Sequence, residues 1–383
     1  RSYIASKFRI NKPSNLEDFI ISKFGKKLYS MFFESYTKKV WGRHPSAISA
    51  EWGAQRIKGL SVRKVLIDII QKGLRKMRPY SSLEIGQKNT ETSLIENFLY
   101  PKYGPGQMWE EVANDLRKQG IVIHMNKRVI KLDLDILEKT SQIKSITIED
   151  RKGEKQIENY DYVISTMPIC ELVEGIISDK LDEIFPKEIR KIASDLPYRD
   201  FITVGLLLKS LKDPSGCKID DTWIYVQESD VKIGRLQIFN NWSPYLVSDS
   251  TKFWVGLEYF CNQGDKLWTA TDSELIDLAK QEMSKLNLCQ ENDFIDGTVL
   301  REPKTYPAYF DSYKQFDKLI ERFNYINNLF LIGRNGMHKY NNQDHSMLTG
   351  FRAADLIVKK ETSPIDKNKL WLINTEQDYH EEK

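Results

Sequence analysis

Three consecutive polar residues, Asp344, His345 and Ser346, lie where the sequence changes from a strand pattern to a helix pattern. Before them, residues 329–332 form a short apolar run that is typical of a buried strand, and Gly333 ends it. After them, apolar residues recur at helical spacing, and these are Met347, Phe351, Ala354 and Val358. Free backbone N–H groups at such a helix N-terminus attract electron-rich or anionic ligand atoms. The pattern predicts a cofactor site, and an ordinary α/β connection with a polar loop is the alternative.

The same segment resembles the C-terminal flavin motif of UDP-galactopyranose mutases, which reads close to GR-x4-KYYDMDQ. Gly333-Arg334, Lys339-Tyr340 and Asp344 match that motif, whereas residues 341–343 (Asn-Asn-Gln) replace its Tyr-Asp-Met and favour a sister family. The surrounding pattern also resembles flavin amine oxidases and protoporphyrinogen oxidases. This resemblance implies FAD as the cofactor, with its isoalloxazine ring covered by this loop and helix. The cofactor-binding residues it implies here are Gly333, Arg334, Asp344, His345, Ser346 and Met347.

A second motif, YTKKVWG at residues 36–42, is close to the mutase sequence YTEKQWG. In mutases its tryptophan lies near the sugar nucleotide, which implies that Trp41 borders the substrate; a tryptophan packed in a helical core is the alternative. Arginines at mutase-like positions could meet a diphosphate, because guanidinium groups bind phosphates bidentately. The predicted substrate-binding residues are Trp41, Arg56 or Arg63, Arg235 and Tyr340, with ordinary surface arginines as the alternative.

Histidine titrates near neutrality, so an acid–base role for His338 and His345 is the alternative to packing and hydrogen bonding in the loop. Neither histidine has a partner that the sequence identifies, and we favour packing. No catalytic residue is assigned. The sequence contains no H-E-x-x-H, no Cys/His cluster with metal spacing and no G-x-S-x-G, so it predicts neither a metal site nor a serine nucleophile.

A G-x-G-x-x-G phosphate-binding turn, with which the resembled superfamily opens, is absent from the sequence, which starts with Arg1. We therefore expect a fragment that lacks about one N-terminal βαβ unit. The 57 basic and 54 acidic residues give a net charge of +3, which provides no electrostatic reason to expect nucleic acid. No apolar run approaches the ~18 residues of a membrane span. We expect a cytoplasmic protein that acts on a small molecule, and no pattern specifies an oligomeric state.

The expected fold class is mixed α/β. It combines a truncated, Rossmann-like FAD/NAD(P)-binding domain with a helical domain and an antiparallel-sheet substrate domain. In the FAD-binding part, the resemblance implies that the backbone of Val129 contacts the adenine, and a plain core valine is the alternative. The expected boundaries are 1–99 for the helical domain, 100–170 for the returning FAD-binding part, 171–315 for the sheet domain, 316–360 for the C-terminal FAD-binding strand, loop and helix, and 361–383 for a tail.

Three functions follow from these patterns. The favoured one is an FAD-dependent oxidoreductase of the amine oxidase or protoporphyrinogen oxidase type, which passes a hydride from the substrate to flavin N5. The first alternative is a mutase-like isomerase acting on a nucleotide sugar. The second alternative is a non-catalytic fragment without cofactor.

Overall fold

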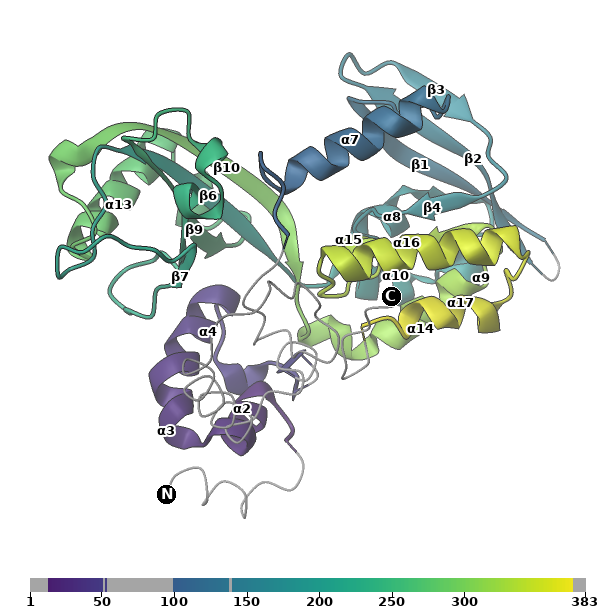
Figure 1. Ribbon diagram of the computed structural model, residues 1–383. Helices are drawn as coiled ribbons and strands as arrows, with labels where there is room; N and C mark the ends of the chain where they lie inside the picture. Colours follow the sequence, from purple (N-terminus) through teal and green to yellow (C-terminus); the bar gives the residue numbers. More distant parts are fainter. Residues whose placement is uncertain (1–12, 51, 54–98, 138–139, 375–383) are drawn as a thin grey trace, which may run out of the picture. The chain divides into compact units, whose positions relative to one another are not determined.

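The computed structural model describes residues 13–50, 52–53, 99–137 and 140–374 (Figure 1). Contacts between residues divide the chain into two compact units, each discontinuous in sequence. Unit 1 consists of Arg1–Ile121, Arg199–Pro303 and Gln377–Lys383, and unit 2 consists of Val122–Tyr198 and Lys304–Glu376. The transitions at 121, 198 and 303 differ from the expected boundaries at 99, 170 and 315. The helices after residue 170 pack with unit 2, and the chain enters unit 1 again only where the long antiparallel strands begin.

The N-terminal part of unit 1 is helical. Helix α2 (Leu16–Phe24) starts at Asn15, whose side chain accepts a hydrogen bond from the Asp18 N–H. The S-x-x-E spacing of residues 14–17 favours Ser14 as the N-cap, but the structure has the N-cap one residue later, at Asn15. Four apolar side chains at helical spacing are buried on one face: Leu16, Phe19, Ile20 and Phe24. The next elements are α3 (Lys26–Leu28), a π-helical segment (Tyr29–Phe33), α4 (Glu34–Trp41) and a 3-10 turn (Pro45–Ala47).

Unit 1 also contains a five-stranded sheet with the order β10-β6-β9-β8-β7. Its strands are β6 (Tyr198–Leu208), β7 (Trp223–Tyr225), β8 (Arg235–Ile238), β9 (Phe253–Cys261) and β10 (Phe294–Pro307). The pairs β6–β9, β8–β9 and β7–β8 are antiparallel, which confirms the predicted antiparallel sheet. Helix α13 (Asp272–Lys285) opens with a capping box of Thr271 and Glu274. Further helices in the described part of this unit are α7 (Pro105–Lys118), α11 (Phe239–Trp242) and α12 (Lys266–Thr269).

Unit 2 has a four-stranded sheet with the order β3-β2-β1-β5. Its strands are β1 (Lys127–Ile136), β2 (Ser141–Asp150), β3 (Lys155–Glu158) and β5 (Ile176–Ile177). The pairing is antiparallel between β1 and β2 and parallel between β1 and β5. The β-prone composition of residues 121–123 favours a strand, but in the structure these residues belong to no strand. They directly follow the left-handed Gly120 that terminates α7, and they form no ladder with another strand.

A second, parallel pair of strands in unit 2 carries the predicted loop and helix. Strand β4 (Val163–Ser165) pairs with β11 (Leu329–Leu331). The chain then forms α15 (Gly333–Gly336), α16 (Gln343–Val358) and α17 (Pro364–Trp371). Part of the predicted tail is therefore ordered helix. Its start is marked by Ser363, which accepts a hydrogen bond from the Asp366 N–H and precedes a proline in the first turn.

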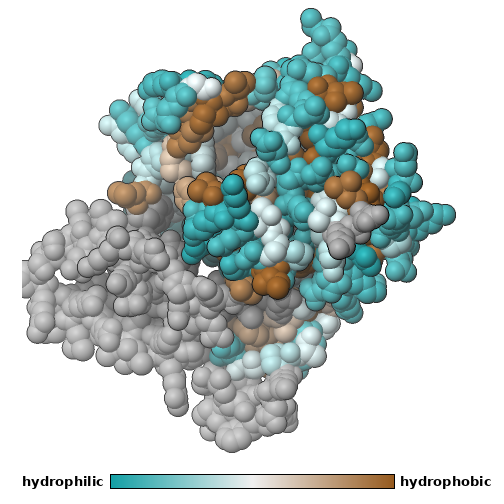
Figure 2. Space-filling view, turned by 90° about the vertical axis from the view of Figure 1, so that its right-hand side faces the viewer, coloured by the Kyte–Doolittle hydropathy of each residue, from teal (hydrophilic) through white to brown (hydrophobic). Residues whose placement is uncertain are grey.

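The apolar face predicted for α16 was wrong. Its buried residues are Thr349, Ala353 and Leu356, whereas Phe351 is 64% exposed and Val358 is 81% exposed. Helix α16 carries two apolar stripes, and the one that packs on β11 and α17 contains a threonine that hydropathy alone does not select. On the face of the molecule drawn in Figure 2, apolar side chains likewise reach the surface among polar ones.

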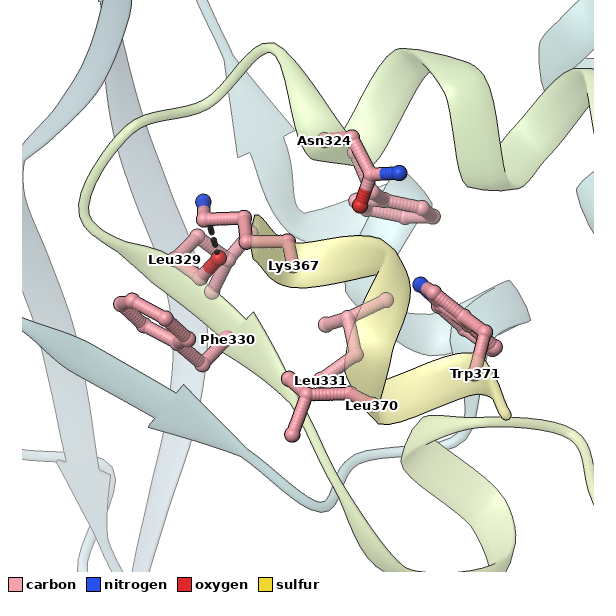
Figure 3. A pocket seen from close by; sticks show the side chains of 8 residues that line it. Asn324, Leu329, Phe330, Leu331, Lys367, Leu370 and Trp371 are labelled. Atoms are coloured by element: carbon pink, nitrogen blue, oxygen red, sulfur yellow. Dashed lines mark hydrogen bonds between the residues drawn. The ribbon is translucent and has the colours of Figure 1, made fainter. Parts of the chain in front are cut away.

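Helix α17 lies against β11 through a buried lysine (Figure 3). Lys367 Nζ donates hydrogen bonds to the carbonyl oxygens of Ile326 and Leu329, the latter at 2.8 Å. Burial lowers the pKa of Lys367 to about 7. Leu370, on the same helix, packs with Phe330 of β11 and Leu356 of α16.

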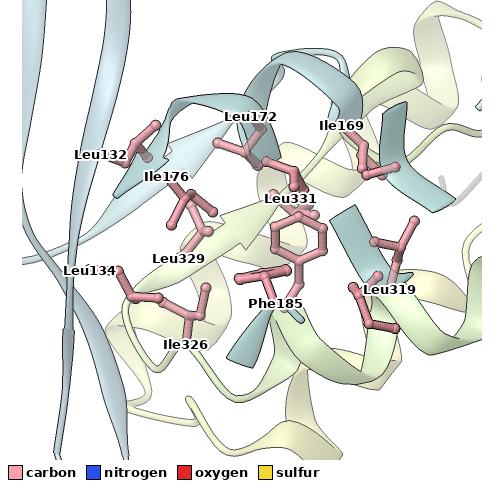
Figure 4. Close-up of a cluster of buried hydrophobic side chains, with 14 of the residues drawn as sticks. Leu132, Leu134, Ile169, Leu172, Ile176, Phe185, Leu319, Ile326, Leu329 and Leu331 are labelled. Carbon is pink, nitrogen blue, oxygen red and sulfur yellow. The ribbon is translucent and has the colours of Figure 1, made fainter. Parts of the chain in front are cut away.

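The main core of unit 2 lies between its two sheets and their helices. Phe185 is fully buried among aliphatic side chains from β1, β5, β11 and α8 (Ile169–Gly175), as Figure 4 shows. Helices α9 (Leu181–Ile184), α10 (Lys187–Ser194) and α14 (Phe316–Asn324) complete it. This core fixes the C-terminal end of β11, from which the predicted cofactor loop starts.

Candidate functional site in the strand, loop and helix after β11

Gly333 turns the chain at the end of β11. Its φ of 77° lies in the left-handed region that side chains other than glycine rarely adopt, and its N–H donates to Thr349 Oγ1 at 2.9 Å. Gly336 packs directly on β4, because a Cβ at that position would lie 2.5 Å from the carbonyl oxygen of Ser165. The two glycines therefore set how closely the loop approaches the parallel strands.

Arg334 closes the loop on itself. Its Nε donates to the carbonyl oxygen of Asn341 at 2.8 Å, and an Nη donates to that of Thr305 at 3.2 Å. Its guanidinium also lies over the ring of Tyr340 at 4.9 Å, and Tyr340 stacks on Tyr306 with ring centroids 5.5 Å apart. Arg334 and Tyr340, both predicted as site residues, are thus brought together, and their contacts shape the loop.

His338 is fully buried beneath the loop. Its Nε2 lies 3.2 Å from the carbonyl oxygen of Ala308, and its ring packs edge-on against Tyr198 with centroids 4.6 Å apart. Burial lowers the pKa of His338 to about 4, so the imidazole is neutral at neutral pH. These contacts confirm that His338 has a packing and hydrogen-bonding role.

The N-terminus of α16 presents backbone donors. Asn342 is the N-cap residue and makes no side-chain capping hydrogen bond. The first intrahelical bond runs from the Ser346 N–H to the carbonyl oxygen of Asn342 at 3.0 Å. The N–H groups of the three preceding residues, Gln343 to His345, therefore have no carbonyl acceptor within the helix. Such an end suits an anionic or electron-rich group.

The predicted residues Asp344, His345, Ser346 and Met347 all lie in the first turns of α16. Asp344 is the second residue of the helix and does not cap it. The Asp344 carboxylate lies 3.2 Å from Nδ1 of His345. Burial opposes ionisation of Asp344, but the adjacent imidazole, together with the backbone N–H groups of His345 and Asp344, outweighs it and lowers the pKa of the carboxyl group. A carboxylate at a helix N-terminus is also favoured by the helix dipole.

The other predicted residues lie elsewhere in the chain. Val129 is on β1, and its side chain packs against the core of unit 2. Trp41 ends α4 in unit 1, is 2% exposed and contacts Trp52 edge-on at 5.4 Å. Arg56 and Arg63 lie outside the described residues.

Arg235 in unit 1 is buried and paired. Its Nε donates to the carboxylate of Glu258, which lies directly across the β8–β9 ladder. Its guanidinium also lies 4.9 Å from the rings of both Trp223 and Phe260. Burial raises the pKa of Glu258, an effect that the positive charge of Arg235 opposes. The sequence analysis missed Glu258, because only the strand register places it opposite Arg235.

Among the residues that the structure describes, no group of three His, Cys, Asp or Glu side chains could hold a metal ion. Within the same residues, no helix combines the length and the apolar character that crossing a membrane requires.

With this geometry in place, known proteins can be compared. A family model described as flavin containing amine oxidoreductase matches residues 16–358. The chain belongs to this family. It is therefore a member of a flavin oxidoreductase enzyme family, which confirms the relationship that the loop motif indicated.

Solved structures are similar in fold. Reduced UDP-galactopyranose mutase has a TM-score of 0.70 at 21% identity, over 99% of this chain and 76% of the mutase chain. A putative protoporphyrinogen oxidase from Exiguobacterium has a TM-score of 0.51 at 14% identity, over 83% of this chain and 62% of that chain. At these identities the likeness concerns the fold, and it confirms the mixed α/β class.

Proposed function

We propose that the protein is an FAD-dependent oxidoreductase that transfers a hydride from a small-molecule substrate to flavin N5. The observation that carries this proposal is the uncapped N-terminus of α16, preceded by left-handed Gly333, in a chain of a flavin-containing family. The parallel strands β4 and β11, with α16 following β11, are also typical of part of a Rossmann-like domain. When bound, the flavin supplies the redox chemistry.

In this proposal the loop and helix bind and orient the cofactor. The backbone N–H groups of residues 343–345 face electron-rich atoms of the flavin, and the Asp344 carboxylate accepts a hydrogen bond from a cofactor hydroxyl or ring N–H. Arg334 and Tyr340 hold the loop in shape through the contacts described above. Buried His338 packs beneath the loop through its contacts with Ala308 and Tyr198, and it is neutral at neutral pH because burial lowers its pKa to about 4.

A mutase-like isomerase is the second candidate, and the likeness over 99% of the chain to a UDP-galactopyranose mutase favours it. That reaction requires a cationic clamp for a diphosphate. Arg235, the predicted clamp residue within the described part of the chain, already faces the buried Glu258 carboxylate. Because the carboxylate offsets the guanidinium charge, this pair supports the oxidoreductase over the isomerase.

The proposal is tested with the full-length protein by flavin absorbance and by titration of the FAD-free protein with FAD. The protein should be yellow, and Asp344→Ala should weaken FAD binding about tenfold, the equivalent of one hydrogen bond to a charged group. Asp355→Ala is the matched control, because Asp355 lies on the same helix in its last turn and should leave affinity unchanged. Colourless protein that takes up no FAD would refute the proposal and leave the non-catalytic alternative.

A further inference from the structure

The segment after α16 makes specific contacts with the predicted flavin loop. Helix α17 ends at Trp371, and residues 372–374 continue beneath residues 339–341 of the loop. Lys339 Nζ donates to the carbonyl oxygens of Trp371 and Ile373, the latter at 2.7 Å. The ammonium thereby satisfies carbonyl groups at the C-terminal end of α17, where a positive charge is favoured.

Asn374 makes the second connection. Its Nδ2 donates to Asn341 Oδ1 at 3.0 Å and to the carbonyl oxygen of Tyr340 at 3.4 Å. Asn341 in turn donates from its Nδ2 to the carbonyl oxygen of Gly333 at 3.2 Å. A continuous set of amide contacts therefore links residue 374 to the turn that starts the loop. Both asparagines are buried, so these bonds are shielded from water.

The segment that holds the loop is itself anchored. Lys367 binds two carbonyl oxygens at the start of β11, and Leu370 packs in the cluster of β11 and α16. Trp371 contacts Phe316 of α14 edge-on, with ring centroids 5.9 Å apart. The loop is thus tied to an element fixed in the core of unit 2.

We propose that residues 364–374 form a C-terminal clamp of the flavin site, in which Lys339 and Asn374 are positioning residues. They fix residues 339–341, and these lead directly into the uncapped N-terminus of α16. The inference deepens the proposed function and rests on it. Its physical basis is preorganisation: donors held in place before the ligand arrives lose less freedom on binding.

Two variants remove the clamp contacts without straining the backbone. Asn374→Gly deletes both amide contacts and tolerates the φ of 63° at this position. Lys339→Met removes the ammonium and keeps the aliphatic stem. The matched control is Lys39→Met. Lys39 of α4 is a half-buried lysine that likewise donates to two backbone carbonyl oxygens, those of Val226 and Ile233, and it belongs neither to the clamp nor to the loop.

The experiment measures FAD dissociation constants of the full-length protein by flavin fluorescence, hydrogen exchange of residues 337–345 in the FAD-free protein, and thermal unfolding. Asn374→Gly and Lys339→Met should raise the dissociation constant about tenfold and speed exchange in the loop. Lys39→Met should lower the unfolding temperature while leaving the dissociation constant within about twofold. If the wild type binds FAD and both clamp variants have the same FAD dissociation constant as the wild type, the clamp alone is refuted. If the wild type binds no FAD, the proposed function and the clamp are refuted together.

Discussion

At the scale of single residues, the site depends on buried polar groups that lie against backbone carbonyl oxygens. His338 has a carbonyl oxygen as its Nε2 neighbour and aromatic rings around it, and Lys367 has two carbonyl oxygens and no carboxylate partner among the hydrogen bonds and ion pairs described. In both cases burial disfavours the charged form and lowers the pKa, to about 4 for His338 and about 7 for Lys367. Such groups make stability depend on pH.

For His338 the direction of that dependence follows from linkage. The unfolded histidine has a pKa of 6.5 and binds a proton as the pH falls, whereas the folded one resists protonation down to about pH 4. The stability of the wild type should therefore decline between pH 6.5 and pH 4, by roughly 3 kcal/mol at most from this residue. His338→Asn, which tolerates the φ of 44°, should remove that part of the decline in urea unfolding series. The control is His124→Asn, which changes an exposed histidine and should keep the pH dependence of the wild type. The prediction is contradicted if the free energy of unfolding of His338→Asn varies with pH in parallel with that of the wild type.

At the scale of elements, the strand, loop and helix after β11 are held together by close backbone packing. Gly336 leaves no room for a side chain against β4, whereas a Cβ on Gly350 of α16 would meet only Ile332 Cδ1 at 3.8 Å. Gly336→Ala should therefore destabilise the protein by ~1–3 kcal/mol. Gly350→Ala should stabilise it by ~0.5–1 kcal/mol, because alanine is the better helix residue. Thermal and urea unfolding measure the change in stability of each variant. If both substitutions change the free energy of unfolding by the same amount and in the same direction, α15 does not pack on β4 as tightly as described.

Many elements could be predicted from the sequence because their signals are local. The capping box of Thr271 and Glu274, the buried face of α2 and the strand at residues 329–331 each depend on residues a few positions apart. The buried face of α16 could not, because two apolar stripes compete and only the position of β11 and α17 selects between them. Periodicity identifies a helix but does not say which of two faces has a partner.

The site was predictable in the same partial way. The motif placed Gly333, Arg334, Tyr340 and Asp344 in one loop and helix start, and the structure has them there. The groups that hold the loop are distant in sequence: Ala308 for His338, and Asn374 for Asn341. Likewise, the pairing of Arg235 with Glu258 depends on the register of β8 against β9. Contacts of this kind are set by tertiary structure, so no local pattern shows them.

At the scale of the whole molecule, three segments of the chain form unit 1 and two form unit 2. Unit 2 contains the candidate flavin loop, and unit 1 contains the antiparallel sheet with the Arg235–Glu258 pair. The fold is similar to that of a UDP-galactopyranose mutase and of a putative protoporphyrinogen oxidase. Fold alone does not choose between an isomerisation and an oxidation.

The decisive prediction concerns UDP. On the isomerase alternative, Arg235 belongs to a diphosphate clamp, each arginine–phosphate contact contributes about 1.5–3 kcal/mol, and its loss should weaken UDP binding about tenfold to a hundredfold. On the oxidoreductase proposal, Arg235 is neutralised by Glu258 and has a structural role, so calorimetric titration of the reduced full-length protein with UDP should give no saturable heat. Removing Arg235 alone would leave a buried carboxylate unpaired, so the informative variant is Arg235→Met with Glu258→Gln, in which both charges are removed together. Saturable UDP binding by the wild type that this folded double variant loses would make the isomerase the better proposal, because the guanidinium would then bind phosphate despite its buried partner.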